Sequence, residues 1–278
     1  MSRQSNPHEI TCMEIWGGNA RAKRAIGITG FDVWVSSNPY QNMPDGGDIY
    51  YISSCGAGKI SRFSLADISG HGTSASYFAK CLRKLMRKYI NTTDQTRFAQ
   101  KLNDDFSVFA RKGMFATALL TAYDAETDKL KICNAGHPKP LLYRKQNNTW
   151  WILDEALEDC SGQVINIPLG INGETNYLQY EISLMPGDIM VMYTDAAMEV
   201  LDKTGSPLGE TGLLALVEDI PKDDPQHFGE ALHARLFYKQ SPGDDVTLIV
   251  LFHNASNPPR QNLYQRLQSV WRMVVTQD

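Results

Sequence analysis

The sequence predicts an α+β fold in which one β-sheet packs on another and helices cover the outside. Two observations support this prediction. Short apolar runs rich in β-branched and aromatic residues recur along the chain, and many are joined by brief turns, as antiparallel strands are. Two longer segments, 74–90 and 94–111, instead repeat apolar residues every three or four positions, which is typical of amphipathic helices. Many antiparallel strands with helices in pairs indicate a layered α+β domain.

The N-terminal part of the chain is dominated by predicted strands. They cover 10–16, 26–35, 48–54 and 60–68, with turn residues interrupting the second run. Gly17, Gly18 and Asn19 predict a loop after the first strand, and 55–58 is typical of a hairpin loop.

The two predicted helices each present one apolar face. On helix 74–90 the apolar residues are Phe78, Cys81, Leu82, Leu85, Met86 and Tyr89, and the opposite face carries Lys80, Arg83, Lys84, Arg87 and Lys88. Thr73 or Ser74 is expected to cap its start. The inner side of helix 94–111 carries Phe98, Leu102, Phe106 and Phe109. The basic face is either a solvated surface or one that steers an acidic partner.

Residues 115–153 predict an antiparallel meander of four strands. The strands cover 115–124, 129–136, 140–145 and 149–153. After a polar interval at 154–177 we expect strands at 177–184 and 189–195, helices at 209–217 and 225–238, and a last strand at 246–252. Residues 254–261 predict a linker to an amphipathic helix at 262–275. That helix either packs on its own domain or docks to a second subunit, giving a homodimer, or to a regulator.

Composition excludes several classes of protein. The 278 residues are 42% apolar and 21% charged with a net charge of −4, which favours an ordinary globular protein and gives no reason to expect nucleic acid or an anionic membrane as partner. Five cysteines without a CxxC pair argue against a disulfide framework and a thiolate zinc site. The first residues lack the apolar core of a signal peptide. We therefore expect a cytoplasmic protein with no membrane partner.

Four aspartates stand at the ends of separate predicted strands: Asp48, Asp67, Asp195 and Asp244. Sheet formation would bring their carboxylates to one edge. Two unit charges roughly 4 Å apart repel by about 4 kcal/mol at an effective dielectric near 20. Hard divalent cations with oxygen ligands relieve such repulsion. A single aspartate after a strand is more often a turn former or a helix cap, so the prediction of a metal site depends on all four occurring together.

Two divalent ions held by these aspartates would clamp a phosphoryl group and lower the pKa of a shared water. Ligation by oxygen alone favours Mg²⁺ or Mn²⁺ over zinc. The pattern therefore indicates metal-assisted hydrolysis of a phosphate ester.

Further motifs accompany the aspartates in a fixed order. They are GGD (46–48), ADISGHG (66–72), FAT (115–117), NAGHP (134–138), PLGI (168–171), PGD (186–188), YTD (193–195) and DDVT (244–247). Together they resemble the metal-dependent (type 2C, PPM) serine/threonine phosphatases, specifically the bacterial RsbU/SpoIIE-like branch. The resemblance implies a four-layer αββα sandwich, two antiparallel sheets between helical layers, and hydrolysis of phosphoserine or phosphothreonine on a protein.

The resemblance also implies roles for individual residues. Asp67 would bridge both ions, with the backbone carbonyl of Ile68 as a further ligand. Asp195 and Asp244 would complete the shell of one ion, and Asp48 would serve the other. Asp67, Asp195 and Asp244 are thus the expected catalytic residues.

Three departures from the family pattern concern the same site. Ala196 follows Asp195 where glycine is usual, which is tolerable if the backbone there is not left-handed. Ser69 stands where animal relatives carry a histidine general acid, so protonation of the leaving group is unassigned. A phosphate-gripping arginine has no clear counterpart, and the substitutes to consider are Arg21, Lys23 and Arg24.

Other polar residues near the motifs have plainer interpretations. His71, His137 and Asp188 are expected to shape turns. Asp245 either tunes the metal shell or caps the last strand.

The resulting hypothesis is a domain over 1–253 with phosphatase activity, followed by the linker and helix of 254–278. The resemblance implies a phosphorylated anti-sigma-factor antagonist as substrate, in a partner-switching pathway. Regulation would come from a separate protein, from the N-terminal strands and segment of 1–45, or from the helices at 74–111. Two alternatives stay open: an inactive module that binds a phosphorylated partner, and a hydrolase of small phosphate esters.

Overall fold

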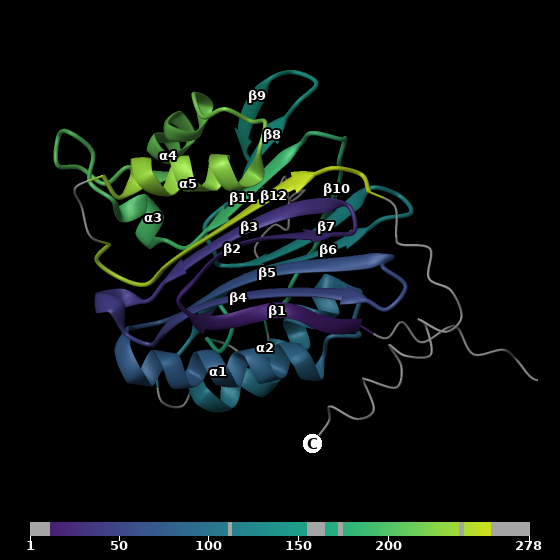
Figure 1. The fold of residues 1–278 in the computed structure, drawn as a ribbon. Coiled ribbons are helices and arrows are strands. Elements are labelled where there is room, and N and C mark those ends of the chain that lie inside the picture. Colours follow the sequence, from purple (N-terminus) through teal and green to yellow (C-terminus); the bar gives the residue numbers. More distant parts are fainter. Residues whose placement is uncertain (1–11, 111–112, 155–164, 172–174, 239–241, 257–278) are drawn as a thin grey trace, which may run out of the picture.

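Two six-stranded antiparallel sheets pack face to face in the computed structural model, and helices cover both outer faces (Figure 1). The structure describes residues 12–110, 113–154, 165–171, 175–238 and 242–256. The predicted αββα sandwich is confirmed. Within the described part of the chain, no helix combines the length and apolar character that crossing a membrane requires.

Each sheet combines strands from distant parts of the sequence. The first sheet has the order β1 (Cys12–Ala20), β4 (Asp45–Cys55), β5 (Ile60–Ile68), β6 (Ala116–Asp124), β7 (Lys129–Ala135) and β10 (Tyr180–Ser183). The second has the order β2 (Ala22–Ile28), β3 (Phe31–Asn38), β12 (Val246–His253), β11 (Ile189–Tyr193), β8 (Leu141–Arg144) and β9 (Thr149–Ile152). A short 3₁₀ turn, η1 (Tyr40–Asn42), connects the second sheet to the first between β3 and β4.

Three apolar clusters hold the four layers together. Helices α1 (Gly72–Lys88) and α2 (Gln95–Ala110) cover the first sheet, with Leu82 and Phe106 in the cluster beneath them. Helices α3 (Ala196–Glu199), α4 (Gly209–Glu218) and α5 (Pro225–Leu236) cover the second sheet. The third cluster lies between the sheets and includes Phe63 and Ile249. Alternate residues of the central strands supply the inner and outer clusters, as the two-residue period of a strand requires.

The predicted loop at Gly17, Gly18 and Asn19 is wrong, because all three lie inside β1. Gly17 pairs with Tyr51 and Gly18 with Tyr50 of β4. A Cβ on Gly17 would lie 3.0 Å from the Tyr50 carbonyl oxygen. Glycine therefore allows close approach of two strands here rather than a turn.

The predicted four-stranded meander is wrong at its centre. β6 pairs with β7 and β8 with β9, but β7 and β8 belong to different sheets. The chain crosses at Gly136, whose φ of 67° is left-handed. Asn134 closes this turn, since its side chain accepts from the His137 N–H at 2.7 Å and donates to the His137 carbonyl at 3.0 Å. The main chain of His137 forms part of this turn, while its ring Nδ1 bonds the Thr117 hydroxyl at 2.8 Å.

The helix starts differ from the expected caps. α1 begins at Gly72 with His71 in the cap position, and no side chain caps it, so the Thr73 or Ser74 cap is wrong. Asp94 accepts a hydrogen bond from the Arg97 N–H at the start of α2. The predicted C-terminal helix (262–275) lies outside the described residues.

The basic face of α1 is largely paired with carboxylates of the same chain. Arg83 and Arg87 both bond Glu14 on β1. Lys80 pairs with Asp45 at 2.5 Å and Lys88 with Asp105 at 2.7 Å. These pairs favour the solvated interpretation of this face over a surface that steers an acidic partner.

Glu14 is expected to make stability depend on pH. Burial raises the pKa of Glu14, but the hydrogen bonds from Arg87 and Arg83 together lower it by a larger amount. The pKa of Glu14 is therefore below its ordinary value. Because the pKa of Glu14 is lower in the folded state, the ionised carboxylate stabilises the fold above the unfolded-state pKa of about 4.3. This stabilisation is lost as the pH falls through the folded-state pKa. Glu14→Gln should therefore lower the free energy of unfolding by about 1–2 kcal/mol at neutral pH.

Urea unfolding over a pH series measures this effect. The difference between Glu14→Gln and the wild type should shrink as the pH falls below the unfolded-state pKa of about 4.3 and through the lower folded-state pKa of Glu14. Glu126→Gln, which removes an exposed pair with Lys59, is the control and should leave stability unchanged. A difference for Glu14→Gln that is constant across the pH series would contradict this account.

A candidate metal centre between the two sheets

The fold brings the four predicted aspartates to one end of the sandwich. Asp48 and Asp67 lie on adjacent strands of the first sheet, next to the paired residues Ile49 and Ala66. Asp195 follows β11 and Asp244 precedes β12, which are neighbours in the second sheet. The structure therefore places two carboxylates from each sheet near one another, as their mutual effects on pKa also show.

Asp48 is the most deeply buried of the four, with 2% of its surface exposed. Its Oδ2 accepts a hydrogen bond from the Thr194 hydroxyl at 2.9 Å, whereas Oδ1 has no partner among the described residues. Burial, followed by the charges of Asp67 and Asp245, raises its pKa well above the ordinary value. A buried carboxylate oxygen without a partner is costly, and a cation would relieve that cost.

Asp67 and Asp244 experience the same repulsion. Burial, then the charges of Asp195, Asp244 and Asp245, raises the pKa of Asp67 to about 8. Burial also raises the pKa of Asp244, against a hydrogen bond of 2.8 Å from the Asp245 N–H. The cluster therefore favours positive charge at its centre.

The donor set fits hard cations. All four side chains offer carboxylate oxygens, the ligands that Mg²⁺ and Mn²⁺ prefer. As the side chains stand, no three His, Cys, Asp or Glu residues within the described ranges are arranged to hold an ion. Binding therefore requires the carboxylates to draw closer, which their mutual repulsion opposes until cations are present.

Asp245 and Thr194 support the site, and sequence reasoning gave Thr194 no role. Asp245 is buried and accepts from the Tyr40 N–H at 2.6 Å and from the Gly47 N–H, so it links η1 to the start of β4. Thr194 bonds both Asp48 and the Thr247 N–H, the latter at 3.0 Å. A hydroxyl directly before Asp195 at a strand end was the available signal for Thr194.

The structure explains one departure from the family pattern and shows the surroundings of the neighbouring residues Ser69 and His71. Ala196 is buried in the first turn of α3, which Asp195 enters with right-handed φ and ψ, so its methyl group is accommodated as expected. The hydroxyl of Ser69 accepts from the Phe115 N–H at 3.0 Å. His71 is exposed, and its ring lies 5.9 Å from that of Tyr40.

The three basic residues considered as phosphate ligands have different surroundings. Arg21 bonds the Asn42 side chain in η1, beside Tyr40. Lys23 pairs with Glu230 at 3.5 Å, and Arg24 lies over the Trp16 ring at 5.8 Å. Of these three residues, Arg21 is the one that contacts η1, the segment whose Tyr40 N–H bonds Asp245 at the candidate site.

Replacing Thr194 by valine should destabilise the protein. Valine keeps the shape but removes the donor to Asp48 and the acceptor for the Thr247 N–H. Leaving buried polar groups unpaired costs about 1–3 kcal/mol, measurable as a shift of the denaturant midpoint. Thr194→Ser retains the hydroxyl and should lose much less. Equal stability of the valine variant and the wild type would show that this hydrogen-bonded bridge contributes little.

Comparison with known proteins places the chain in a family. The model of the SpoIIE family (stage II sporulation protein E) matches residues 58–254. The phosphoserine phosphatase RsbU of Bacillus subtilis (strain 168) is 24% identical over 193 residues, which cover 68% of this chain and 55% of that protein. The chain thus spans about half the length of this curated relative.

Solved structures show the same fold at low sequence identity. The RsbU and RsbW domains of Rv1364c from Mycobacterium tuberculosis superpose with a TM-score of 0.68 at 20% identity, covering 91% of this chain and 71% of that one. The PP2C phosphatase domain with a regulatory fragment of SpoIIE from Bacillus subtilis gives 0.66 at 18%, covering 83% and 64%. The catalytic domain of the phosphatase PstP, solved with two manganese ions, gives 0.55 at 13%, covering 80% and 97%.

Proposed function

Because the chain belongs to the SpoIIE family, we propose that it is a metal-dependent protein phosphatase that hydrolyses phosphoserine or phosphothreonine. The observation that carries the proposal is the meeting of Asp48 and Asp67 from one sheet with Asp195 and Asp244 from the other. Such a cluster is stable at neutral pH only with protons or cations. A phosphoserine phosphatase among the relatives and a manganese-bound structural neighbour support the same function.

Asp48, Asp67, Asp195, Asp244 and the Ile68 carbonyl would hold two Mn²⁺ or Mg²⁺ ions. Bound there, the ions would neutralise phosphoryl oxygens and make a water molecule acidic enough to attack near neutral pH. Thr194 fixes one oxygen of Asp48 and leaves the other for a ligand. Asp67 experiences the charges of Asp195 and Asp244 across the two sheets, which suits it to a bridging role.

We further propose a phosphorylated anti-sigma-factor antagonist as the substrate, in a partner-switching pathway of the cytoplasm. Membership of the SpoIIE family and the similarity to RsbU support this choice. Control by a separate regulatory protein, by the N-terminal segment or by α1 and α2 follows from the same resemblance.

Turnover of p-nitrophenyl phosphate and of phosphoserine peptides with added Mn²⁺ tests the proposal. We expect both to be hydrolysed by the wild type, and Asp67→Asn to abolish both activities. Absence of turnover together with weak Mn²⁺ binding in calorimetry would favour the inactive binding module. Hydrolysis of the small ester without hydrolysis of any phosphopeptide would favour the small-ester hydrolase.

A further inference from the structure

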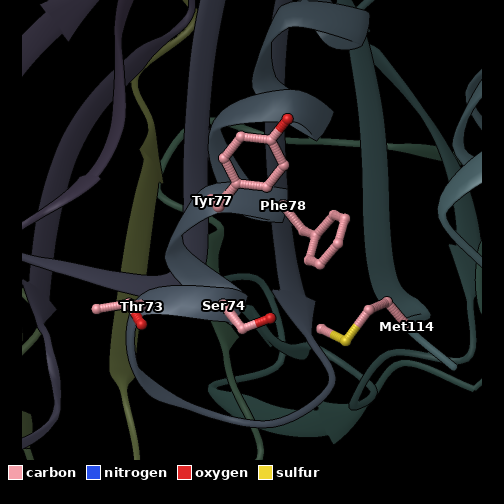
Figure 2. Close-up of a pocket in the computed structure, with 5 residues that line it drawn as sticks. All are labelled: Thr73, Ser74, Tyr77, Phe78 and Met114. Atoms are coloured by element: carbon pink, nitrogen blue, oxygen red, sulfur yellow. The ribbon is translucent and has the colours of Figure 1, made fainter. Parts of the chain in front are cut away.

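A pocket lies beside the candidate site, at the start of α1. It has a volume of about 360 Å³ and is lined by Thr73, Ser74, Tyr77, Phe78 and Met114. Figure 2 shows Met114 pointing from the facing segment back toward the first turns of α1, which carry the other four side chains. The lining contains two hydroxyls, two aromatic rings and a thioether but no charged group. It is therefore suited to an apolar side chain rather than to a phosphate.

Two features of this pocket and its surroundings are typical of a binding surface rather than of a packing defect. Tyr77 is 59% exposed and Phe115, next to Met114, is 37% exposed, although both are large aromatic residues. Phe78 anchors the floor, since its ring packs against Phe109 with centroids 5.3 Å apart. A rigid apolar floor with an exposed aromatic rim is the usual character of a pocket that takes a partner's side chain.

The first turn of α1, which lines the pocket, lies close to the carboxylate cluster: a Cβ at Gly47 would lie 3.1 Å from the Ala75 Cβ and 3.3 Å from both the Asp245 Oδ2 and the Ile68 carbonyl oxygen. Ser69 and Phe115 bond each other twice, through the Ser69 N–H to the Phe115 carbonyl at 2.9 Å and the Phe115 N–H to the Ser69 hydroxyl at 3.0 Å. His71, whose ring lies 5.9 Å from that of Tyr40, the residue whose N–H bonds Asp245, is two residues from Thr73. Two residues of chain span at most about 7 Å, so the pocket begins within a short peptide's reach of the site.

We propose that this pocket binds an apolar side chain of the phosphoprotein substrate, two or three residues away from the phosphorylated serine or threonine. The proposal rests on the phosphatase function proposed above and adds a determinant of specificity to it. The occupant follows from position and chemistry. A peptide whose phosphate lies at the carboxylates and whose chain runs toward α1 places its flanking residues along this rim, since three extended residues reach about 10 Å.

Paired phosphopeptides test the proposal. The two peptides share a central phosphoserine and differ only by leucine or serine at the second or third position from it. We expect the wild type to have about tenfold higher kcat/KM for a leucine peptide, the gain that burying one such side chain provides. Tyr77→Ser and Met114→Ser should remove the preference, and Met114→Leu should keep it. Turnover of p-nitrophenyl phosphate, which has no flanking residue, should not change.

Controls separate this proposal from the function itself. Trp151→Ser removes an aromatic residue that is 56% exposed on β9 and should keep the preference. Binding of the same peptides to the Asp67→Asn variant, measured by fluorescence anisotropy, reports on the pocket even if the wild type hydrolyses no peptide. The leucine peptides should bind to this variant about tenfold more tightly than the serine peptides. The difference in affinity should become smaller when Tyr77→Ser is added to the variant. Equal affinities at every position, or a preference untouched by Tyr77→Ser and Met114→Ser, would overturn the proposal.

Discussion

Asp67→Asn is expected to lower kcat/KM by about a thousandfold or more and, at the same time, to raise the melting temperature of the metal-free protein. The loss of activity follows if the Asp67 carboxylate bridges both ions, because each is then held by one ligand fewer. The gain in stability follows because burial and the carboxylates of Asp195, Asp244 and Asp245 raise the pKa of Asp67 to about 8, so the metal-free protein must take up a proton there on folding at neutral pH, a cost that asparagine does not have. A relief of about 1 kcal/mol corresponds to roughly 2–4 °C for a domain of this size.

Calorimetric melting with a chelator present, together with turnover in Mn²⁺, measures both effects. The control is Asp223→Asn, which removes a carboxylate from an exposed position before α5 and should change neither quantity. A variant that merely misfolds would lose activity and stability together. Loss of activity with a lower melting temperature would therefore contradict the repulsion on which the site is built.

Gly46→Ala should damage the same site through the backbone. A Cβ at Gly46 would lie 2.5 Å from the Oδ1 and 2.6 Å from the Cγ of Asp245. Asp245 cannot move aside without losing its hydrogen bonds from the Tyr40 and Gly47 N–H groups. Since hydrogen bonds to a charged group are worth about 1.5–3 kcal/mol each, we expect destabilisation of about 2–4 kcal/mol. Displacement of the segment that carries Asp48 should also weaken Mn²⁺ binding.

Gly27→Ala is the matched control for this substitution. Gly27 lies in β2, and the nearest atom to its added Cβ is an Asp32 carboxylate oxygen at 3.8 Å, an ordinary contact. Denaturant unfolding and Mn²⁺ titration of both variants give the comparison. If Gly46→Ala unfolded at the same denaturant concentration as Gly27→Ala, the close contact with Asp245 would have no energetic importance.

Much of the fold follows from local patterns in the sequence. The apolar spacing of α1 and α2 and the short β-rich apolar runs of β5 and β12 depend on near neighbours, so their positions were predictable. The crossing between β7 and β8 was not, because a short turn also fits a hairpin. The conformation of Gly136 and the Asn134 hydrogen bonds to His137 decide it. In β1, Gly17 serves an interstrand contact with Tyr50, which no local pattern shows.

The aspartates of the candidate site were predictable from the sequence, but the residues that support them were not. The four aspartates stand out because each opens or follows a predicted strand, and the fold brings them to one end of the sandwich, although not close enough to hold an ion as the side chains stand. The supporting contacts depend on which strands become neighbours in space: Thr194 reaches Asp48 across 146 positions, and Asp245 reaches Gly47 across 198. The hydroxyl directly before Asp195 draws attention to Thr194, but no local pattern shows that Thr194 reaches Asp48 or that Asp245 reaches Gly47. The ligand roles of individual aspartates stay predictions.

Anomalous diffraction at the manganese edge, from crystals grown with Mn²⁺, tests the central claim most directly. The account predicts two peaks between the sheets, with Asp67 contacting both ions, Asp195 and Asp244 on one and Asp48 on the other. The four carboxylates should lie closer together than they do without metal. Crystals that show no manganese at this end of the sandwich, or manganese bound only by other residues, would contradict it.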